Sequence, residues 1–185
     1  MEPQPLLPDP LRTAAIVGLR DGTQVSLRAI RPDDSQRLQA FHARLSPQSV
    51  YLRWLSAHPV LTDEEAENLS RVDYHNRMAF VATLPEALVG TPAIIGVARY
   101  AVAEPEQPGV AEAAVVVADA FQQRGLGTLL LGRLLAYART QGLTTWVAEI
   151  NAQNAPMLRF IQRGGLPSTR RLESGSWQVH IDISE

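Results

Sequence analysis

The stretch from Val115 to Ala138, VVVADAFQQRGLGTLLLGRLLAYA, constrains the fold more than any other part of the chain. Three valines typical of a strand lead into a loop with two glycines, and a run with helical spacing follows. The start of a helix leaves several backbone N–H groups without partners, and the helix dipole adds partial positive charge there. We therefore expect an anion such as a phosphate to bind at the loop 122–127.

Two glycines in such a loop also suit a tight turn without a ligand, and this alternative stays open. Two common phosphate loops are excluded by the residues themselves. A P-loop needs lysine and then serine or threonine after its second glycine, whereas Thr128 and Leu129 follow Gly127. A dinucleotide-binding loop needs a third glycine where this chain has Leu130.

The composition is that of a globular protein, with 185 residues of which 45% are hydrophobic and 19% charged. A net charge of −2 and scattered arginines argue against nucleic acid as a partner. The lack of cysteine excludes disulfides, thiol nucleophiles and cysteine-based zinc sites, and it fits a cytoplasmic location. The four histidines lack metal-ligand spacing, so we expect no metal. We also expect no membrane span and no signal peptide.

Hydrophobic periodicity predicts one α/β domain over residues 13–185, after a flexible proline-rich tail over residues 1–12. The expected fold is a mixed, mostly antiparallel sheet of about seven strands flanked by helices. Strands are expected near residues 25–29, 77–83, 92–102, 109–118 and 143–150, and in a hairpin over 169–183. Turns are expected at 85–90, 104–109 and 174–175. Helices are expected after Pro32, after the N-cap Ser46, after the capping box of Thr62 and Glu65, over 126–140, and after the N-cap Asn154.

The loop resembles the first cofactor motif of the GCN5-related N-acetyltransferase (GNAT) superfamily, Q/R-x-x-G-x-G/A, with Gln122, Gly125 and Gly127 in register. The segment NAQNAPMLRFIQRGGL is similar to the second cofactor segment of that family, in which Asn154 matches. The stretches LRDGTQVSLRAIRPDD, RLSPQSVYLRWL, GVARYAV and AEAAVVVADAFQQRGLG resemble the acetyltransferase domain of bacterial Pat-type protein lysine acetyltransferases. The resemblance covers about residues 20–184 and agrees with the expected order of elements.

The resemblance implies that acetyl-coenzyme A (acetyl-CoA) is the co-substrate. The loop amides would hold its pyrophosphate, and the backbone of the valine strand would pair with its amide-bearing arm. The implied cofactor-binding residues are Val115, Val117, Gln122, Gln123, Arg124, Gly125, Leu126, Gly127, Thr128 and Asn154.

Acetyl transfer to an amine needs a base, because an amine of pKa ~10.4 is mostly protonated at neutral pH. Glu112 is the candidate, since its strand leads into the loop and related Pat-type enzymes carry a functional glutamate there. We expect the apolar strand to desolvate this carboxylate, which would suit a base working near neutral pH. The alternative is a solvated glutamate at the sheet edge. Strand alternation places Glu112, Ala114 and Val116 on one face unless a bulge intervenes.

Many relatives have a tyrosine general acid seven residues after Asn154, but this chain has Ile161 there. Tyr100, on the preceding strand, is a weak substitute that fits the core or its rim better. The tryptophans, Trp54 among them, are also expected in the core. Because the chain has no cysteine, an acetyl-enzyme on a thiol is excluded, and the acetyl group would pass directly to the amine in a ternary complex.

The resulting hypothesis is an N-acetyltransferase that moves acetyl from acetyl-CoA to a primary amine, with a protein lysine as one acceptor class. A small-molecule amine acetyltransferase and a non-catalytic sensor that binds acyl-CoA are the alternatives. We expect the helices at 34–71 and the loops at 103–110 and 168–176 to build the acceptor site. The edge of the C-terminal hairpin would also allow a homodimer, although no residue pattern selects one.

Overall fold

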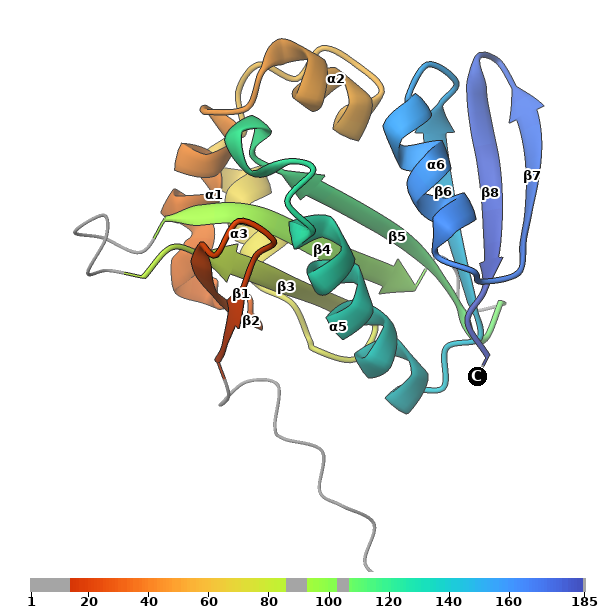
Figure 1. Ribbon diagram of the computed structural model, residues 1–185, viewed down its shortest axis with the longest axis horizontal. Coiled ribbons are helices and arrows are strands. Elements are labelled where there is room, and N and C mark those ends of the chain that lie inside the picture. Colours follow the sequence, from red (N-terminus) through yellow and green to blue (C-terminus); the bar gives the residue numbers. More distant parts are fainter. Residues whose placement is uncertain (1–13, 86–92, 103–106, 185) are drawn as a thin grey trace, which may run out of the picture.

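One open sheet of eight strands runs through the computed structural model, which describes residues 14–85, 93–102 and 107–184 (Figure 1). The strands lie in the order β1-β2-β3-β4-β5-β6-β8-β7, and β5 with β6 is the parallel pair. The strands are β1 Ala15–Gly18, β2 Gln24–Ala29, β3 Arg77–Thr83, β4 Ile94–Val102, β5 Val110–Val117, β6 Thr145–Asn151, β7 Ser168–Glu173 and β8 Ser176–Asp182. The helices are α1 Ser35–His42, α2 Pro47–Trp54, α3 Asp63–Ser70, α5 Leu126–Thr140 and α6 Ala155–Arg163, with short 3-10 helices η1 Pro32–Asp34 and η2 Asp119–Phe121.

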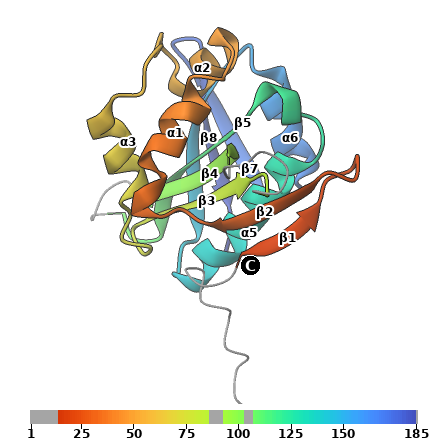
Figure 2. The same cartoon turned by 90° about the vertical axis from the view of Figure 1, so that its left-hand side faces the viewer.

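Three helices, α1, α2 and α3, cover one face of the sheet, and α5 lies on the other (Figure 2). The caps of α2 and α3 are those expected from the sequence. Ser46 Oγ accepts a hydrogen bond from the backbone N–H of Ser49 at 3.2 Å, and Thr62 and Glu65 form a reciprocal capping box. Each cap satisfies amide groups that the first turn of a helix leaves free, so these short helices start at defined residues.

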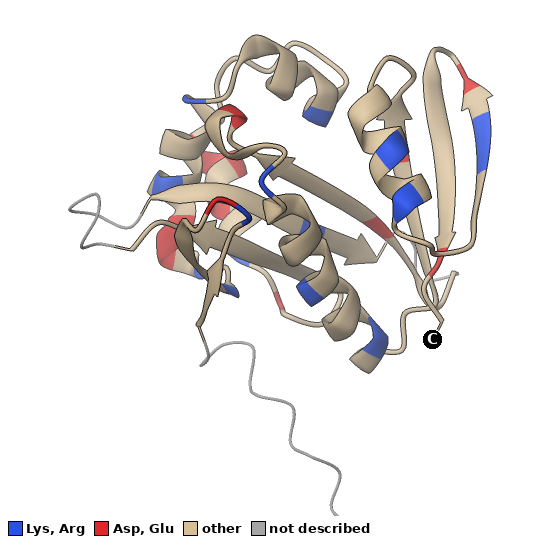
Figure 3. Cartoon of the chain, in the orientation of Figure 1, with Lys and Arg blue, Asp and Glu red and all other residues tan. Residues whose placement is uncertain are grey.

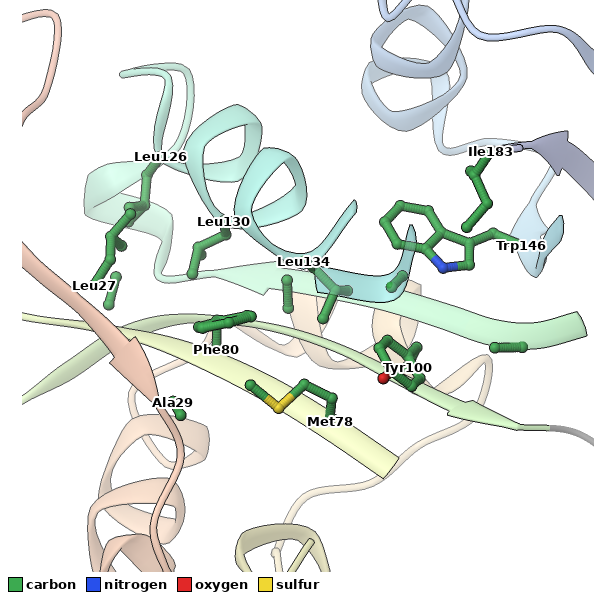
Figure 4. Packing of buried hydrophobic residues seen from close by; sticks show 14 of the residues in the cluster. Leu27, Ala29, Met78, Phe80, Tyr100, Leu126, Leu130, Leu134, Trp146 and Ile183 are labelled. Atoms are coloured by element: carbon green, nitrogen blue, oxygen red, sulfur yellow. The ribbon is translucent and has the colours of Figure 1, made fainter. Parts of the chain in front are cut away.

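The long helix α5 buries one stripe against the sheet (Figure 4). Leu126, Leu130 and Leu134 recur every four residues, and each is at most 1% exposed. They pack in one cluster with Phe80 of β3. Gly96 of β4 is required for this close approach, because a Cβ atom there would lie 2.9 Å from Leu130 Cδ1. The stripe thus fixes where the helix begins relative to the sheet.

A buried carboxylate holds the segment between β2 and α1 in place. Asp34 is fully buried, and its two oxygens accept hydrogen bonds from Arg28 at 2.6 and 2.7 Å. Arg37 of α1 and the backbone N–H of Arg31 donate to the same carboxylate at 3.0 and 2.9 Å. The sequence analysis saw only a helix start at Pro32, whereas the structure shows that this start is held by a charged cluster.

The parallel strands β5 and β6 pair over three positions and then separate (Figure 1). The paired positions are Val110 with Thr145, Ala111 with Trp146 and Glu112 with Val147. Beyond them, the β6-facing edge of β5 has no partner strand within the described residues. A strand edge without a neighbour offers backbone N–H and C=O groups to a ligand. This opening leads from Glu112 toward the start of α5.

The α/β class, the mostly antiparallel sheet and the order of elements from β2 onward are confirmed. About seven strands were expected and eight are present, because β1 was missed. With four residues, AIVG is too short to show a period, and its pairing with β2 identifies it. The tail 1–12, residues 86–90 of one predicted turn and residues 104–106 of another lie outside the described residues. The domain bounds stay a prediction.

β6 and the outer strand of the C-terminal hairpin are less buried than the strands at the centre of the sheet. β6 lies inside the sheet, but only Trp146 and Ile150 among its residues are buried, because its end separates from β5. The hairpin turns at Ser174-Gly175 as predicted. Its outer strand β7 is exposed along its whole length, and a homodimer there stays a prediction. None of the helices in the described ranges is long and apolar enough to cross a membrane.

Candidate active site

The loop between β5 and α5 presents a run of free amides. Gln123 and Gly125 have φ values of 61° and 90°, in the left-handed region, and Gly125 precedes the first helical residue without a side-chain cap. Within the part of the chain that the structure describes, the N–H groups of residues 123–128 have no hydrogen-bond acceptor. Successive amides at a helix start form a concave site for an anion, and the helix dipole adds to it.

The backbone of the loop requires glycine at one of its two glycine positions and not at the other. Gly125 needs its positive φ, so the turn alone explains it. Gly127 has no such need, and a Cβ atom there would meet only Val117 Cγ2 within 4 Å, at 3.9 Å. The space over Gly127 is therefore free of protein atoms. The turn therefore requires a glycine at position 125 but not at position 127.

The side chains around the loop mostly hold it in place. Gln122 Nε2 donates to Val117 O at 3.1 Å and to Ser49 Oγ at 3.2 Å. Arg124, expected at the rim, forms an ion pair with Asp21 at 2.6 Å, which offsets part of its charge. Arg20 was missed by the sequence analysis. A Cβ atom at Gly125 would lie 3.4 Å from Arg20 Nε, so this exposed arginine is the second cation beside the loop.

Asp119 connects the loop to helix α2. Its carboxylate accepts hydrogen bonds from Ser46 N at 3.0 Å, Ser46 Oγ at 2.7 Å and Ser49 Oγ at 2.8 Å. Burial pushes the pKa of Asp119 up, but these hydrogen bonds outweigh it and hold the pKa below its ordinary value. Asp119 thus joins the N-terminus of α2 to the segment that leads into the loop before α5.

We expect Asp119→Ala to lower the free energy of unfolding by about 1–2 kcal/mol, since the variant loses charge-assisted hydrogen bonds at a partly exposed site. The stabilisation needs the ionised carboxylate, so it should be present above about pH 4 and fade as the pH falls through the lowered pKa. Urea unfolding at pH 7 and pH 3 measures both effects. Asp182→Ala, which removes hydrogen bonds to Ser184 alone, is the control. An equal or smaller loss at Asp119 would show that the link to α2 stabilises nothing.

Glu112 lies on β5 at the last position paired with β6. The register of β4 with β5 runs without a shift from Gly96–Val117 to Val102–Ala111, so the alternation that groups Glu112, Ala114 and Val116 holds. The expected desolvation is wrong, because Glu112 is exposed. Exposure keeps the carboxylate accessible to a substrate at the point where the strands separate.

A second exposed glutamate lies on the same face of the sheet as Glu112. Val147 is paired with Glu112, and Glu149, two residues further along β6, lies on the same face and is exposed. The sequence analysis did not consider it, because only the pairing register brings the two strands together.

The remaining predicted site residues have structural contacts. Tyr100 is buried on the α5 face and donates to His75 O at 2.9 Å, and burial raises the pKa of its hydroxyl. A general-acid role for Tyr100 is therefore disfavoured. Asn154 is the predicted N-cap, with Oδ1 accepting from the N–H of Met157 at 3.1 Å. Val115 and Val117 are half-buried toward α5 on the open stretch of β5.

A cavity lies between helices α1 and α2 and the sheet, on the face of β5 to which Glu112 and Ala114 belong. Its lining combines apolar side chains with Arg53 and Trp54 of α2, Arg99 of β4 and Ala114 of β5. Trp54 also stacks on His58 with ring centroids 4.2 Å apart, so its assignment to the core is only partly right. No group of three or more His, Asp or Glu side chains in the described ranges could hold a metal ion.

The family model described as "Acetyltransferase (GNAT) family" matches residues 47–165, which include β5, the loop, α5 and α6. This chain belongs to the GNAT family of acetyltransferases. It is 35% identical to the acetyltransferase PA5475 of Pseudomonas aeruginosa, over 89% of this chain and 87% of that protein. It is 31% identical to the acetyltransferase Pat of Mycolicibacterium smegmatis, over 90% of this chain but 48% of that longer protein.

The similarity extends to solved structures. The GNAT domain of S. lividans PAT superposes with a TM-score of 0.82 at 29% identity, covering 91% of this chain and 96% of that one. The predicted family and the predicted enzyme class are thus confirmed. This GNAT acetyltransferase therefore carries the fold of a family that uses acetyl-CoA, with the free loop amides beside the open edge of β5.

Proposed function

We propose that this GNAT acetyltransferase transfers acetyl from acetyl-CoA to a primary amine by direct transfer in a ternary complex. The observation that carries the proposal is the run of free amides over residues 123–128, at the end of a strand edge that has lost its neighbour. A pyrophosphate suits the amides and the dipole of α5. The amide-bearing arm of the same molecule suits the backbone of β5 between Ala113 and Val117.

The proposed reaction has one base and no covalent enzyme intermediate. Glu112 accepts the proton of the incoming amine, directly or through a water molecule. The amine nitrogen forms a bond to the thioester carbonyl carbon, the carbon–sulfur bond breaks, and coenzyme A leaves as a thiolate. An ordinary thiol has a pKa of about 8.5, so the leaving thiolate needs little help from an acid and water can protonate it. At Ile161, the position of the tyrosine acid in many relatives, no acidic side chain is among the residues that line the adjoining cavity.

The similarity to Pat makes a protein lysine one acceptor to test, with a small amine as the other. The chain itself contains no lysine, so all 17 of its Lys+Arg residues are arginines. Acetyl-lysine detected by mass spectrometry after a reaction must therefore come from the acceptor. This makes the chain well suited to a direct search for protein substrates.

Binding of acetyl-CoA by isothermal titration calorimetry tests the cofactor site. We expect Gly127→Glu to raise the Kd about 100-fold, or about 2.7 kcal/mol, because a carboxylate would enter the free space before the amides and repel phosphate. Gly132→Glu is the matched control on the same helix, where a Cβ atom would meet nothing within 4 Å. Its Kd should stay within about twofold of wild type.

Two results would overturn this assignment. An equal loss in both variants would mean that added negative charge on α5 weakens binding from any position, so the loop would not be the site. A folded wild-type protein that binds no acetyl-CoA would overturn the proposed function as a whole. Circular dichroism of each variant checks the fold.

A further inference from the structure

We propose that the acceptor of this enzyme is a small amine that carries a carboxylate, and that Arg53 and Arg99 bind this carboxylate. The inference rests on the proposed function and deepens it by naming the substrate class. It starts from two arginines that come from different elements, α2 and β4, and line the same cavity. The other basic residues are spread over the elements of the fold (Figure 3).

Neither arginine has a carboxylate partner. Within the described residues, no ion pair involves the guanidinium of Arg53 or Arg99. Arg53 lies over the ring of Trp54 at 5.0 Å, and Arg99 donates only a long hydrogen bond, 3.4 Å, to Leu69 O. Guanidinium groups that are half-buried among apolar side chains are costly unless an anion accompanies them.

The two charges also act on each other. Burial, together with the positive charges of Arg53 and Arg77, lowers the pKa of Arg99 to about 9. Burial lowers the pKa of Arg53 as well, while the negative charge of Glu112 opposes the shift. A bound carboxylate would relieve the repulsion between the two guanidinium groups and form paired hydrogen bonds with them.

The strand register places the cavity residue Arg99 near the proposed base Glu112. Arg99 is paired with Ala114, and Ala114 lies two residues from Glu112 on the same face of β5. Residues two apart on a strand are separated by about 7 Å. The backbone positions of Arg99 and Glu112 are thus close, and the charge of Glu112 acts on Arg53, so we infer that a short spacer, as in a small amino acid, joins the amine to the carboxylate. A long lysine side chain on a protein would leave the arginines without their anion.

The test compares free amino acids with their carboxamides as acceptors. Coenzyme A release is measured at saturating acetyl-CoA for glycine, β-alanine and larger amino acids, each beside its own carboxamide. We expect kcat/KM to be at least about tenfold higher for the carboxylates, as a hydrogen-bonded ion pair implies. Arg99→Gln and Arg53→Gln should raise KM for the carboxylates about tenfold or more and leave the carboxamides within about twofold. Arg71→Gln, an exposed arginine of α3's end, is the control.

Equal rates for amino acids and carboxamides would overturn the inference, and so would a panel on which no free amino acid is acetylated. If lysine peptides are acetylated while that panel is inactive, the proposed function stands and this inference fails. If acetyl-CoA does not bind, the proposed function fails first, which the calorimetry shows independently.

Discussion

Replacing Glu112 with glutamine is expected to lower kcat by about 10²–10⁴-fold, the range typical of losing a general base. The isosteric amide cannot accept the proton of the amine. The KM for acetyl-CoA should stay within about twofold of wild type, because the amides proposed to bind its phosphates lie at the start of α5 and not on β5. Initial rates at saturating acceptor between pH 6 and pH 9 provide the measurement. The loss in the variant should shrink toward high pH, where more of the amine is already deprotonated.

Two controls make this result specific to one carboxylate. Glu173→Gln removes another exposed strand glutamate, at the end of β7, and should leave kcat unchanged. Glu149→Gln tests the glutamate that shares the face of Glu112 across the opening. If the rate loss occurs in Glu149→Gln and not in Glu112→Gln, the base has been assigned to the wrong strand. If neither variant loses rate while acetyl-CoA still binds, the proposed base mechanism is contradicted and the non-catalytic sensor becomes the better interpretation.

Asp34→Ala should lower the free energy of unfolding by about 3–5 kcal/mol, the usual loss when one partner of a buried ion pair is removed. The variant leaves Arg28, whose side chain is only 12% exposed, without its bidentate partner. Urea unfolding followed by circular dichroism measures the loss. Asp33→Ala is the matched control, because this neighbour is 69% exposed and lies 3.6 Å from Arg37. It should lose less than about 1 kcal/mol.

The contribution of Asp34 should also depend on pH. Burial alone would raise the pKa of Asp34, but hydrogen bonds and charge from Arg28, with help from Arg31 and Arg37, hold the pKa below its ordinary value. The stabilisation is therefore present above the unfolded pKa of about 3.9 and is lost as the pH falls through the lower folded value. The difference in the free energy of unfolding between wild type and Asp34→Ala should therefore decrease below pH 4. A constant gap down to pH 2 would contradict the ionised state.

The loop 122–125 and the helix α5 that follows it could be predicted because their signals are local. Gly125 carries a positive φ, the free amides follow from any helix start, and the spacing of Leu126, Leu130 and Leu134 fixes the buried stripe of α5. Asn154 and the capping box of Thr62 and Glu65 are equally local, and the structure has them as expected. Such features depend on a few neighbouring residues, so the sequence alone contains them.

The burial of individual strand residues could not be predicted from the sequence. Glu112 was expected to be desolvated by its apolar strand, yet β5 has partners on both sides only up to that residue, and the carboxylate is exposed. Tyr100, considered as a general acid, lies on the α5 face, whereas Arg99, which the sequence did not single out, lies on the opposite face and lines a cavity. The environment of a strand residue depends on where neighbouring strands end and which helix covers each face, and these are long-range facts.

The sequence by itself determined the family, the strand–loop–helix order and the candidate base, because each is written in residue types at short spacing. Only the tertiary structure decided what surrounds them. It joined Asp119 to α2, placed Arg20 beside Gly125, set Glu149 on the same face of the sheet as Glu112, and brought Arg53 and Arg99 into one cavity. These partners are far apart in the chain, and their proximity follows from strand register and helix packing, which no short segment specifies.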